Sequence, residues 1–298
     1  MGLAISCHPY FPEILSGTDC FYMENNPYLE FSWPHPYLAI GNVVCGVPLE
    51  ISGDIAGATM SLHATKSGPE PMLAVYADDS LIAQIEPRGE LGEGGEYFYD
   101  DTLYSIQIPE GTEKLKLQVE RDNVSFDTII FEKNGIKTTI LPSDGYGWLI
   151  YEDPLPVIVN GDGTYTNSEN LYCDADFIYE KAVKPYRNIA EKYGVGFMIG
   201  EFGVFGTKVP WNIEPVAAFH ETYLEMVEKY DLPWCSCELF NDFPKHLVIW
   251  EKDFVEGDVS QWLGATVEDY TLTCSDGSTK ELKICKELVD VFTRYTMD

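Results

Sequence analysis

The stretch from residue 46 to residue 135 constrains the fold of this chain more than any other part. It holds seven short segments in which apolar and polar residues alternate, separated by glycine, proline or aspartate. These segments read VPLEISG, GATMSLHAT, PMLAVYAD, SLIAQIEPR, EYFYDDTLYSIQIP, EKLKLQVERD and FDTIIFEK. Alternation indicates strands with one buried face, and short strands between turns at this spacing are typical of a β-sandwich. The sequence therefore predicts an antiparallel β-sandwich over residues 46–135.

The parts of the chain on either side of this stretch have a different pattern. Three runs are mainly apolar, as in strands that are covered on both faces: LAISCHPY, VGFMIGE and LPWCSCELF. Three longer segments place apolar residues at helical spacing: DADFIYEKAVKPYRNIAEKYG, NIEPVAAFHETYLEMVEKY and STKELKICKELVDVFTRY. Gly194 is expected to end the first helix, and Ser278 with Glu281 is expected to cap the start of the last. Helices that alternate with buried strands predict a parallel α/β fold.

We therefore expect an α/β chain with an all-β module inserted between its first strand and its first helix. Residues 1–45 are expected to hold the first strand and a lead-in rich in proline and aromatic residues. Residues 46–135 form the predicted sandwich, and residues 136–298 hold a connector rich in glycine and aspartate with the remaining strands and helices.

The composition bears on possible partners. Asp and Glu outnumber Lys and Arg 49 to 19, which gives a formal net charge of −30 at pH 7. Such a chain repels phosphate backbones, so we expect no nucleic-acid partner. The 19 tyrosines and six tryptophans favour a neutral sugar ligand, because flat aromatic rings stack on sugars. The alternative is that the acidic charge serves only to keep the chain soluble. No stretch is long enough for a membrane span and no signal peptide is visible.

The histidine and cysteine spacings do not indicate a metal site. No C-x-x-C pair with a matching partner pair is present, and no spacing among the histidines is that of a metal centre. We therefore expect no metal and no cofactor. The sequence does not fix the oligomeric state.

Glu201 is the most unusual charged residue of the apolar runs. In GVGFMIGEFGVFG, residues 194–206, it follows a strand-like run and is flanked by Gly200 and Gly203. A carboxylate there is costly unless it has a structural partner or a function. The working residues of α/β barrels stand at the carboxyl ends of strands, and His8 and Tyr10 hold the corresponding place on the first strand. A helix cap or a buried ion pair is the structural alternative.

These motifs carry a resemblance. Three motifs resemble, in their order along the chain, strands six, seven and eight of glycoside hydrolase family 5, the cellulase-like β/α barrels. They are the His-x-Tyr of ISCHPYFPEI, the Gly-Glu-Phe-Gly of residues 200–203, and LPWCSCELF. The resemblance implies an α/β fold, namely a partial (β/α)8 TIM barrel of strands six to eight. The inserted antiparallel β-sandwich resembles the carbohydrate-binding modules that some of these enzymes contain.

The resemblance also implies a function. The chain is expected to belong to a retaining O-glycosyl hydrolase, cellulase- or endoglucanase-like, that acts on β-linked plant polysaccharide outside the cell. Glu201 is then the catalytic nucleophile, His8 contacts the sugar and Tyr10 donates a hydrogen bond to the nucleophile. Trp211 is a candidate platform for a sugar ring, and it could equally anchor the helix that follows.

The sequence departs from the family in two places. The family's acid/base glutamate lies in an Asn-Glu-Pro motif on strand four, and no segment here matches strands one to five. WNIEP is similar, but Glu214 and Pro215 are expected in the first turn of a helix that Asn212 caps. Cys237 stands where relatives have a tryptophan. We therefore expect a C-terminal portion that lacks the acid/base glutamate and hydrolyses little alone.

Two other classes of function remain open. In the first, the chain is a non-catalytic carbohydrate-binding protein whose sandwich binds sugar through aromatic side chains. The candidates are Tyr76, Tyr97, Phe98, Tyr99 and Tyr104. These rings also fit an ordinary strand that alternates inward and outward side chains. The second class is an α/β enzyme of another reaction type, but the sequence contains no Gly-rich phosphate loop, H-E-x-x-H or G-x-S-x-G motif.

Overall fold

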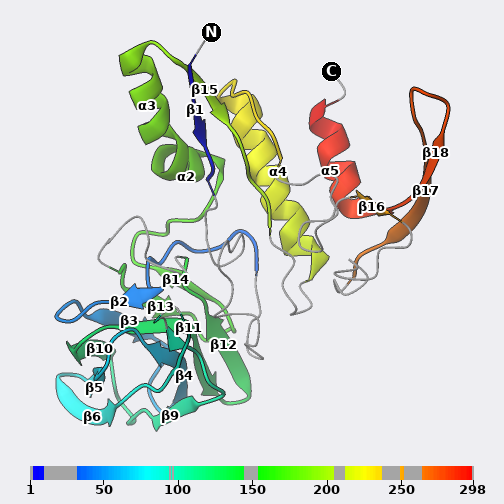
Figure 1. Cartoon of the computed structure of the whole chain (residues 1–298). Helices are drawn as coiled ribbons and strands as arrows, with labels where there is room; N and C mark the ends of the chain where they lie inside the picture. Colours follow the sequence, from blue (N-terminus) through cyan, green and yellow to red (C-terminus); the bar gives the residue numbers. More distant parts are fainter. Residues whose placement is uncertain are drawn as a thin grey trace.

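The computed structural model contains two parts, each with its own hydrophobic core (Figure 1). It describes residues 3–9, 32–93, 95, 97–143, 154–204, 212–236, 249–251 and 264–296. The first part consists of two stacked β-sheets. The second part consists of helices that pack on a short parallel sheet, followed by an antiparallel ribbon.

The larger sheet of the first part has the strand order β14-β13-β3-β10-β5-β6. Its strands are β3 (Leu49–Gly53), β5 (Met72–Ala77), β6 (Ser80–Ile85), β10 (Lys114–Arg121), β13 (Val157–Val159) and β14 (Tyr165–Asn167). All neighbours are antiparallel except β13 and β3, which are parallel. The sheet therefore includes strands from the segment that the sequence assigned to the connector.

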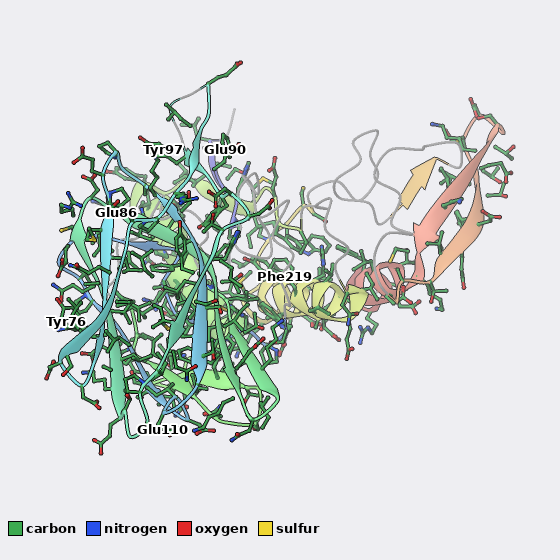
Figure 2. The ribbon with its side chains drawn as sticks, turned by 90° about the horizontal axis from the view of Figure 1, so that it is seen from below. Tyr76, Glu86, Glu90, Tyr97, Glu110 and Phe219 are labelled. Atoms are coloured by element: carbon green, nitrogen blue, oxygen red, sulfur yellow. The ribbon has the colours of Figure 1, made fainter. Side chains whose placement is uncertain are left out.

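The second sheet has the order β12-β11-β4-β9, and a short strand also pairs with β11. Its strands are β2 (Asn42–Val43), β4 (Thr59–Lys66), β9 (Leu103–Gln107), β11 (Val124–Lys133) and β12 (Ile136–Ile140). Two further strands, β7 (Glu90–Leu91) and β8 (Tyr97–Phe98), pair with each other in a separate two-stranded sheet. They project from the edge of the sandwich (Figure 2).

The alternation of the strands explains how the two sheets pack. On β10, Leu115, Leu117 and Val119 are buried, while the residues between them are less so. They pack with side chains of the opposite sheet, among them Met60 and Phe126. Burial of apolar area at roughly 25 cal/mol per Å² is the main force that holds such sheets together.

The second part begins with a parallel pair of strands. β1 (Ala4–Cys7) pairs with β15 (Gly196–Ile199), and a single bridge joins Ile199 to Trp234 in the same direction. The chain before β15 forms α2 (Ala175–Ile178), a π-helical turn η2 (Tyr179–Val183) and α3 (Lys184–Tyr193). Gly194 ends α3 with a φ of 62°, a left-handed conformation that glycine adopts easily. The predicted C-cap is confirmed.

The described part of the chain adds two more helices and a three-stranded sheet to the second part. The helices are α4 (Ile213–Lys229) and α5 (Lys286–Thr296), and the strands are β16 (Ile249–Glu251), β17 (Val267–Thr273) and β18 (Thr279–Cys285). β17 and β18 form a long ribbon beside α5 (Figure 1). Apolar residues of α4 and α5 share one core.

The predicted capping box at Ser278 is wrong, because residues 279–285 are a strand and the helix begins at Lys286. Asp276 accepts hydrogen bonds from the backbone nitrogen and the hydroxyl of Ser278. Gly277 has a φ of +82°, and the nitrogen of Cys274 donates to the carbonyl of Ser278. The Asp-Gly pair therefore makes a hairpin turn, which the helical spacing did not indicate.

The two parts meet around the segment that precedes the sandwich. The indole nitrogen of Trp33 donates to Oγ1 of Thr222 at 3.0 Å, and its ring packs edge-on against Phe219 of α4. A few residues later, the ring of Tyr37 lies 4.8 Å from that of Phe177 in α2. These aromatic contacts fix where the chain leaves the helical part and enters the sandwich.

The predicted fold class, a partial (β/α)8 barrel, is wrong. Among the described residues most strands are antiparallel and lie in separate sheets, and no sheet closes into a barrel. Outside the sandwich, the parallel pairing that the described residues show is limited to the four residue pairs of β1 and β15 and the bridge at Ile199. A barrel needs every strand to pair on both sides. An apolar run indicates burial of a strand, but it does not indicate how many neighbours that strand has.

Candidate functional site

Glu201 and His8 lie together where two neighbouring parallel strands end. Nδ1 of His8 is 3.4 Å from Oε2 of Glu201, and the two side chains are 46% and 42% exposed. The backbone nitrogen of Gly200 donates to the carbonyl of Cys7 at 2.8 Å, which continues the pairing of β1 and β15 up to these residues. The carboxylate is therefore held by an ordered backbone and is open to solvent.

Ser6 orients the imidazole of His8. Its hydroxyl lies 3.1 Å from Nε2, so the ring is held between Ser6 on one side and Glu201 on the other. Residues two apart in a strand share a face, which brings Ser6 and His8 together. The sequence reasoning did not single out Ser6, although this period-2 rule could have found it.

Gly200 has no side chain because His8 and Ser6 occupy that space. A Cβ at residue 200 would collide with the hydroxyl oxygen of Ser6 and would lie 2.7 Å from Nε2 of His8. The glycine before Glu201 therefore allows the imidazole to lie against the strand. This contact gives a physical reason for a glycine next to the carboxylate.

The residues beneath this pair form a rigid aromatic base. Phe202 is buried and stacks on Tyr223 of α4 with ring centroids 5.2 Å apart and planes 6° apart. Trp234 lies 5.6 Å from the same phenyl ring. The hydroxyl of buried Tyr223 donates to the carbonyl of Pro9 at 2.8 Å. α4 thus anchors both chain segments that leave the strands, the one after His8 and the one after Glu201.

Cys7 is adjacent to His8 but does not form a reactive cysteine–histidine pair. Its side chain is buried, and Sγ lies 3.4 Å from the carbonyl of Ala182. Burial raises the pKa of the thiol to about 11. Because the thiolate is the nucleophilic form, this burial disfavours a nucleophilic role for Cys7 at neutral pH.

The structure describes only some of the other residues predicted for this site. Tyr10 and Trp211 lie outside the described residues, as does Cys237. Asn212 caps α4, because its side-chain oxygen accepts from the nitrogen of Glu214 at 3.2 Å. The predicted position of Glu214 in the first turn of α4 is confirmed. A carboxylate there interacts favourably with the positive end of the helix dipole, which is a structural role.

The aromatic residues of the sandwich do not share one flat surface. The hydroxyl of Tyr76 donates to Glu120, and the ammonium of Lys116 lies over its ring. Figure 2 shows Tyr97 beside Glu90 and well away from Tyr76. Three of the other four rings are engaged individually: Tyr97 lies under the Lys66 ammonium, Tyr99 stacks on His63, and the Tyr104 hydroxyl accepts from the nitrogen of Arg88. These contacts favour the interpretation of the rings as ordinary packed side chains over that of a sugar-binding platform.

His63 and Asp127 form a buried pair inside the sandwich. Nδ1 of His63 lies 2.7 Å from Oδ2 of Asp127, and Nε2 lies 2.8 Å from the carbonyl of Asp100. Burial opposes the imidazolium, but the hydrogen bond and the charge of Asp127 outweigh it, so the pKa of His63 is raised. Burial raises the pKa of Asp127 to about 6 even though His63 lowers it. The sequence reasoning missed this pair.

Neither a metal centre nor a membrane span emerges from the described ranges. Within them, no three His, Cys, Asp or Glu side chains are grouped as metal ligands. None of the helices there combines the length and the apolar character that crossing a bilayer requires.

Comparison with known proteins does not assign a family. No family model matches the sequence, and no curated protein matches it either. The resemblance to glycoside hydrolase family 5 therefore rests on the quoted motifs and their order along the chain.

Proposed function

We propose that Glu201 is the catalytic nucleophile of a retaining glycoside hydrolase that acts on β-linked plant polysaccharide. The observation that carries this proposal is the contact of Glu201 with His8 at the tips of two parallel strands. A carboxylate that is fixed by its backbone and still half open to solvent suits attack on a bound sugar. The substrate class implies action outside the cell.

The proposed reaction needs two carboxyl groups. An oxygen of Glu201 attacks the anomeric carbon, the bond to the leaving oxygen breaks, and a glycosyl ester of Glu201 forms. A second carboxyl group about 5–5.5 Å away protonates the leaving oxygen. Glu214 does not fit this role because it lies in the first turn of α4. The resemblance places the acid in an Asn-Glu-Pro motif that this sequence does not contain.

His8 is proposed to contact the sugar beside the reacting carbon. Its ring is fixed by Ser6 and touches the carboxylate of Glu201, so a sugar hydroxyl next to the nucleophile comes within reach of the imidazole. Such a contact would orient the anomeric carbon toward Glu201.

A mechanism-based label tests the nucleophile without the acid. Dinitrophenolate leaves without a proton, so a 2,4-dinitrophenyl 2-deoxy-2-fluoro-β-cellobioside needs only the nucleophile to react. We expect mass spectrometry to find one fluoroglycosyl group on Glu201, and none in Glu201→Gln. Glu214→Gln serves as the matched control and should still be labelled. No label on the unmodified chain, or a label that persists in Glu201→Gln, would contradict the proposal.

A further inference from the structure

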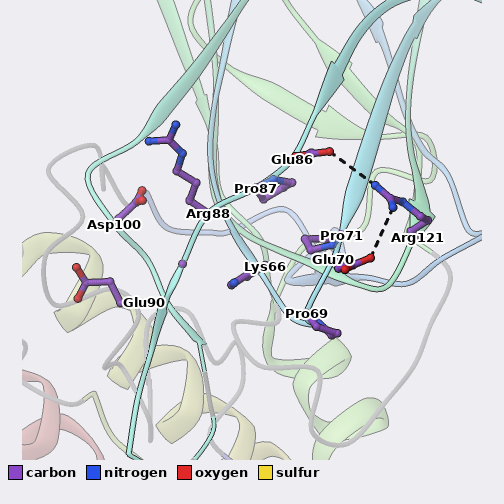
Figure 3. A pocket seen from close by; sticks show the side chains of 11 residues that line it. Lys66, Pro69, Glu70, Pro71, Glu86, Pro87, Arg88, Glu90, Asp100 and Arg121 are labelled. Carbon is purple, nitrogen blue, oxygen red and sulfur yellow. Dashed lines mark ion pairs between the residues drawn. The ribbon is translucent and has the colours of Figure 1, made fainter.

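A polar groove of about 710 Å³ opens on the sandwich, and none of its lining residues belongs to the predicted catalytic site around Glu201 (Figure 3). It lies where the end of β4, the segment after β6 and the end of β10 come together. The lining residues are Lys66, Pro69, Glu70, Pro71, Glu86, Pro87, Arg88, Gly89, Glu90, Asp100 and Arg121. Its volume is in the range of ligand sites, roughly 300–1,000 Å³.

A smaller hollow lies next to the groove. This second hollow of about 400 Å³ is lined by Pro69, Glu70, Arg121 and Asp122, the first three of which also line the groove. The two hollows therefore adjoin at these three residues.

Hydrogen bonds hold the wall of the groove in place. The carbonyl of Arg88 accepts from Oγ1 of Thr65 at 3.0 Å, and its nitrogen donates to the hydroxyl of Tyr104 at 2.7 Å. A Cβ at Gly89 would collide with Oγ1 of Thr65, so this segment lies directly on β4. On the other side His63 donates to the carbonyl of Asp100. A wall that is fixed before binding loses little entropy when a ligand binds.

The charged side chains of the groove fall into two groups. On one side Arg121 lies between Glu70, at 3.9 Å, and Glu86, at 3.7 Å, so these charges offset one another. Figure 3 shows Arg88, Asp100 and Glu90 on the opposite side. Within the described part of the chain, the guanidinium of Arg88 has neither a hydrogen-bond nor an ion-pair partner.

Lys66 adds a second donor between these groups. Its ammonium lies 4.5 Å from the centre of the Tyr97 ring, which steadies the side chain while its hydrogens remain available. The groove thus presents ammonium and guanidinium donors next to the carboxylate acceptors of Glu90 and Asp100.

We propose that this groove binds a neutral oligosaccharide. Each sugar hydroxyl both donates and accepts a hydrogen bond, so it is satisfied by a wall in which cationic donors and carboxylate acceptors are neighbours. A polyanion would meet Glu90 and Asp100 and a chain of formal net charge −30. The proposal does not depend on Glu201, and it assigns sugar binding to the charged side chains of a groove in the sandwich.

Calorimetric titration of the full chain tests the proposal. The probes are the neutral β-1,4-linked hexasaccharides of glucose, xylose and mannose, and hexagalacturonate as the acidic probe. We expect at least one neutral probe to bind, and Arg88→Ala to weaken it about tenfold or more, because a charged hydrogen-bond donor is lost. Lys66→Met, which keeps the length of the side chain, should also weaken binding.

Arg294→Ala is the matched control. It removes the same charge from α5, where Arg294 pairs with Glu221, and it should leave the affinity within about twofold. Hydrogen exchange with the bound probe should protect residues 86–90 and 97–101, and Glu201→Gln should keep both the affinity and this protection. Binding with these features would stand even if Glu201 could not be labelled.

Three results would overturn the proposal. The first is that no neutral hexasaccharide binds, and the second is that hexagalacturonate binds more tightly than any neutral probe. The third is that a neutral probe binds equally well to Arg88→Ala and Lys66→Met and protects residues 196–201 instead. Circular dichroism of each variant would confirm that the sandwich is folded.

Discussion

The imidazole of His63 lies 2.7 Å from the carboxylate of Asp127, on neighbouring strands in the interior of the sandwich. Its other ring nitrogen donates to the carbonyl of Asp100, a residue that lines the polar groove. Since each ring nitrogen faces an acceptor, the arrangement favours a proton on both nitrogens. The protonation of a buried pair is therefore linked to the position of the groove wall.

The stability of the chain should depend on pH through His63. Asp127 raises the pKa of His63 above its ordinary value of 6.5, so the folded chain binds this proton more strongly than the unfolded chain does. The stabilisation is fully present below pH 6.5 and is lost as the pH rises through the raised pKa. We expect the free energy of unfolding in urea to fall over this range, and to fall less in His63→Gln.

Asp127 should act in the same direction at lower pH. Burial raises its pKa from 3.8 to about 6, so the folded chain binds the proton more strongly and stability falls as the pH rises between these values. Asp127→Asn should flatten this part of the curve. The free energy of unfolding should be measured from pH 4 to 9 for the unmodified chain, His63→Gln and Asp127→Asn. If the three curves run parallel, the pair does not control the pH dependence of stability.

Local features of the fold could be predicted from the sequence because they depend on adjacent residues. The C-cap at Gly194 and the N-cap at Asn212 are examples, since each follows from the chemistry of one turn. Residues 279–285 could not be predicted this way. Leu282 and Ile284 fit a strand, while Ile284 and Leu288 also fit a helix, and pairing with β17 decides between the two. The fold class likewise depends on which strands become neighbours, a non-local property.

In the candidate sites, too, local features could be predicted from the sequence and contacts between distant residues could not. The structure brings Glu201 and His8 together, as the motif order implies, but the role of Gly200 becomes visible only with the imidazole in place. In the sandwich, sequence could point to aromatic residues as sugar platforms. It could not show that the hydroxyl of Tyr104 already holds the backbone of Arg88, because these residues belong to different strands and loops.

Gly200→Ala should disturb the Glu201 site without changing its charges. The added Cβ collides with Ser6 and meets the imidazole of His8, so the side chains of Ser6 and His8 must shift from their present places beside Glu201. We expect the rate of labelling by the fluoroglycoside to fall by about tenfold or more, because small displacements of reacting groups are costly. Gly196→Ala is the matched control, since a Cβ there would make an ordinary 3.4 Å contact with Ala4. Equal rates for both variants would remove the proposed role of Gly200.

Cys7 should be resistant to alkylation in the folded chain. Burial raises its pKa to about 11, so at pH 8 almost none of it is thiolate. Cys45 and Cys235 are exposed and serve as internal references. Peptide mass spectrometry after iodoacetamide treatment should find the two references modified and Cys7 unmodified until the chain is unfolded. Modification of Cys7 at the rate of the references would contradict its burial and reopen a nucleophilic role.

Tyr223→Phe should weaken the support beneath the Glu201 site. It removes the hydroxyl that donates to the carbonyl of Pro9, and so leaves a buried acceptor without this partner at a cost of about 1–3 kcal/mol. Because Pro9 follows His8, we also expect slower labelling of Glu201. Tyr270→Phe, on the exposed ribbon, removes a hydroxyl where water replaces it and should change neither quantity. If Tyr223→Phe lowers stability but leaves labelling unchanged, the bond holds α4 to the strand without positioning His8.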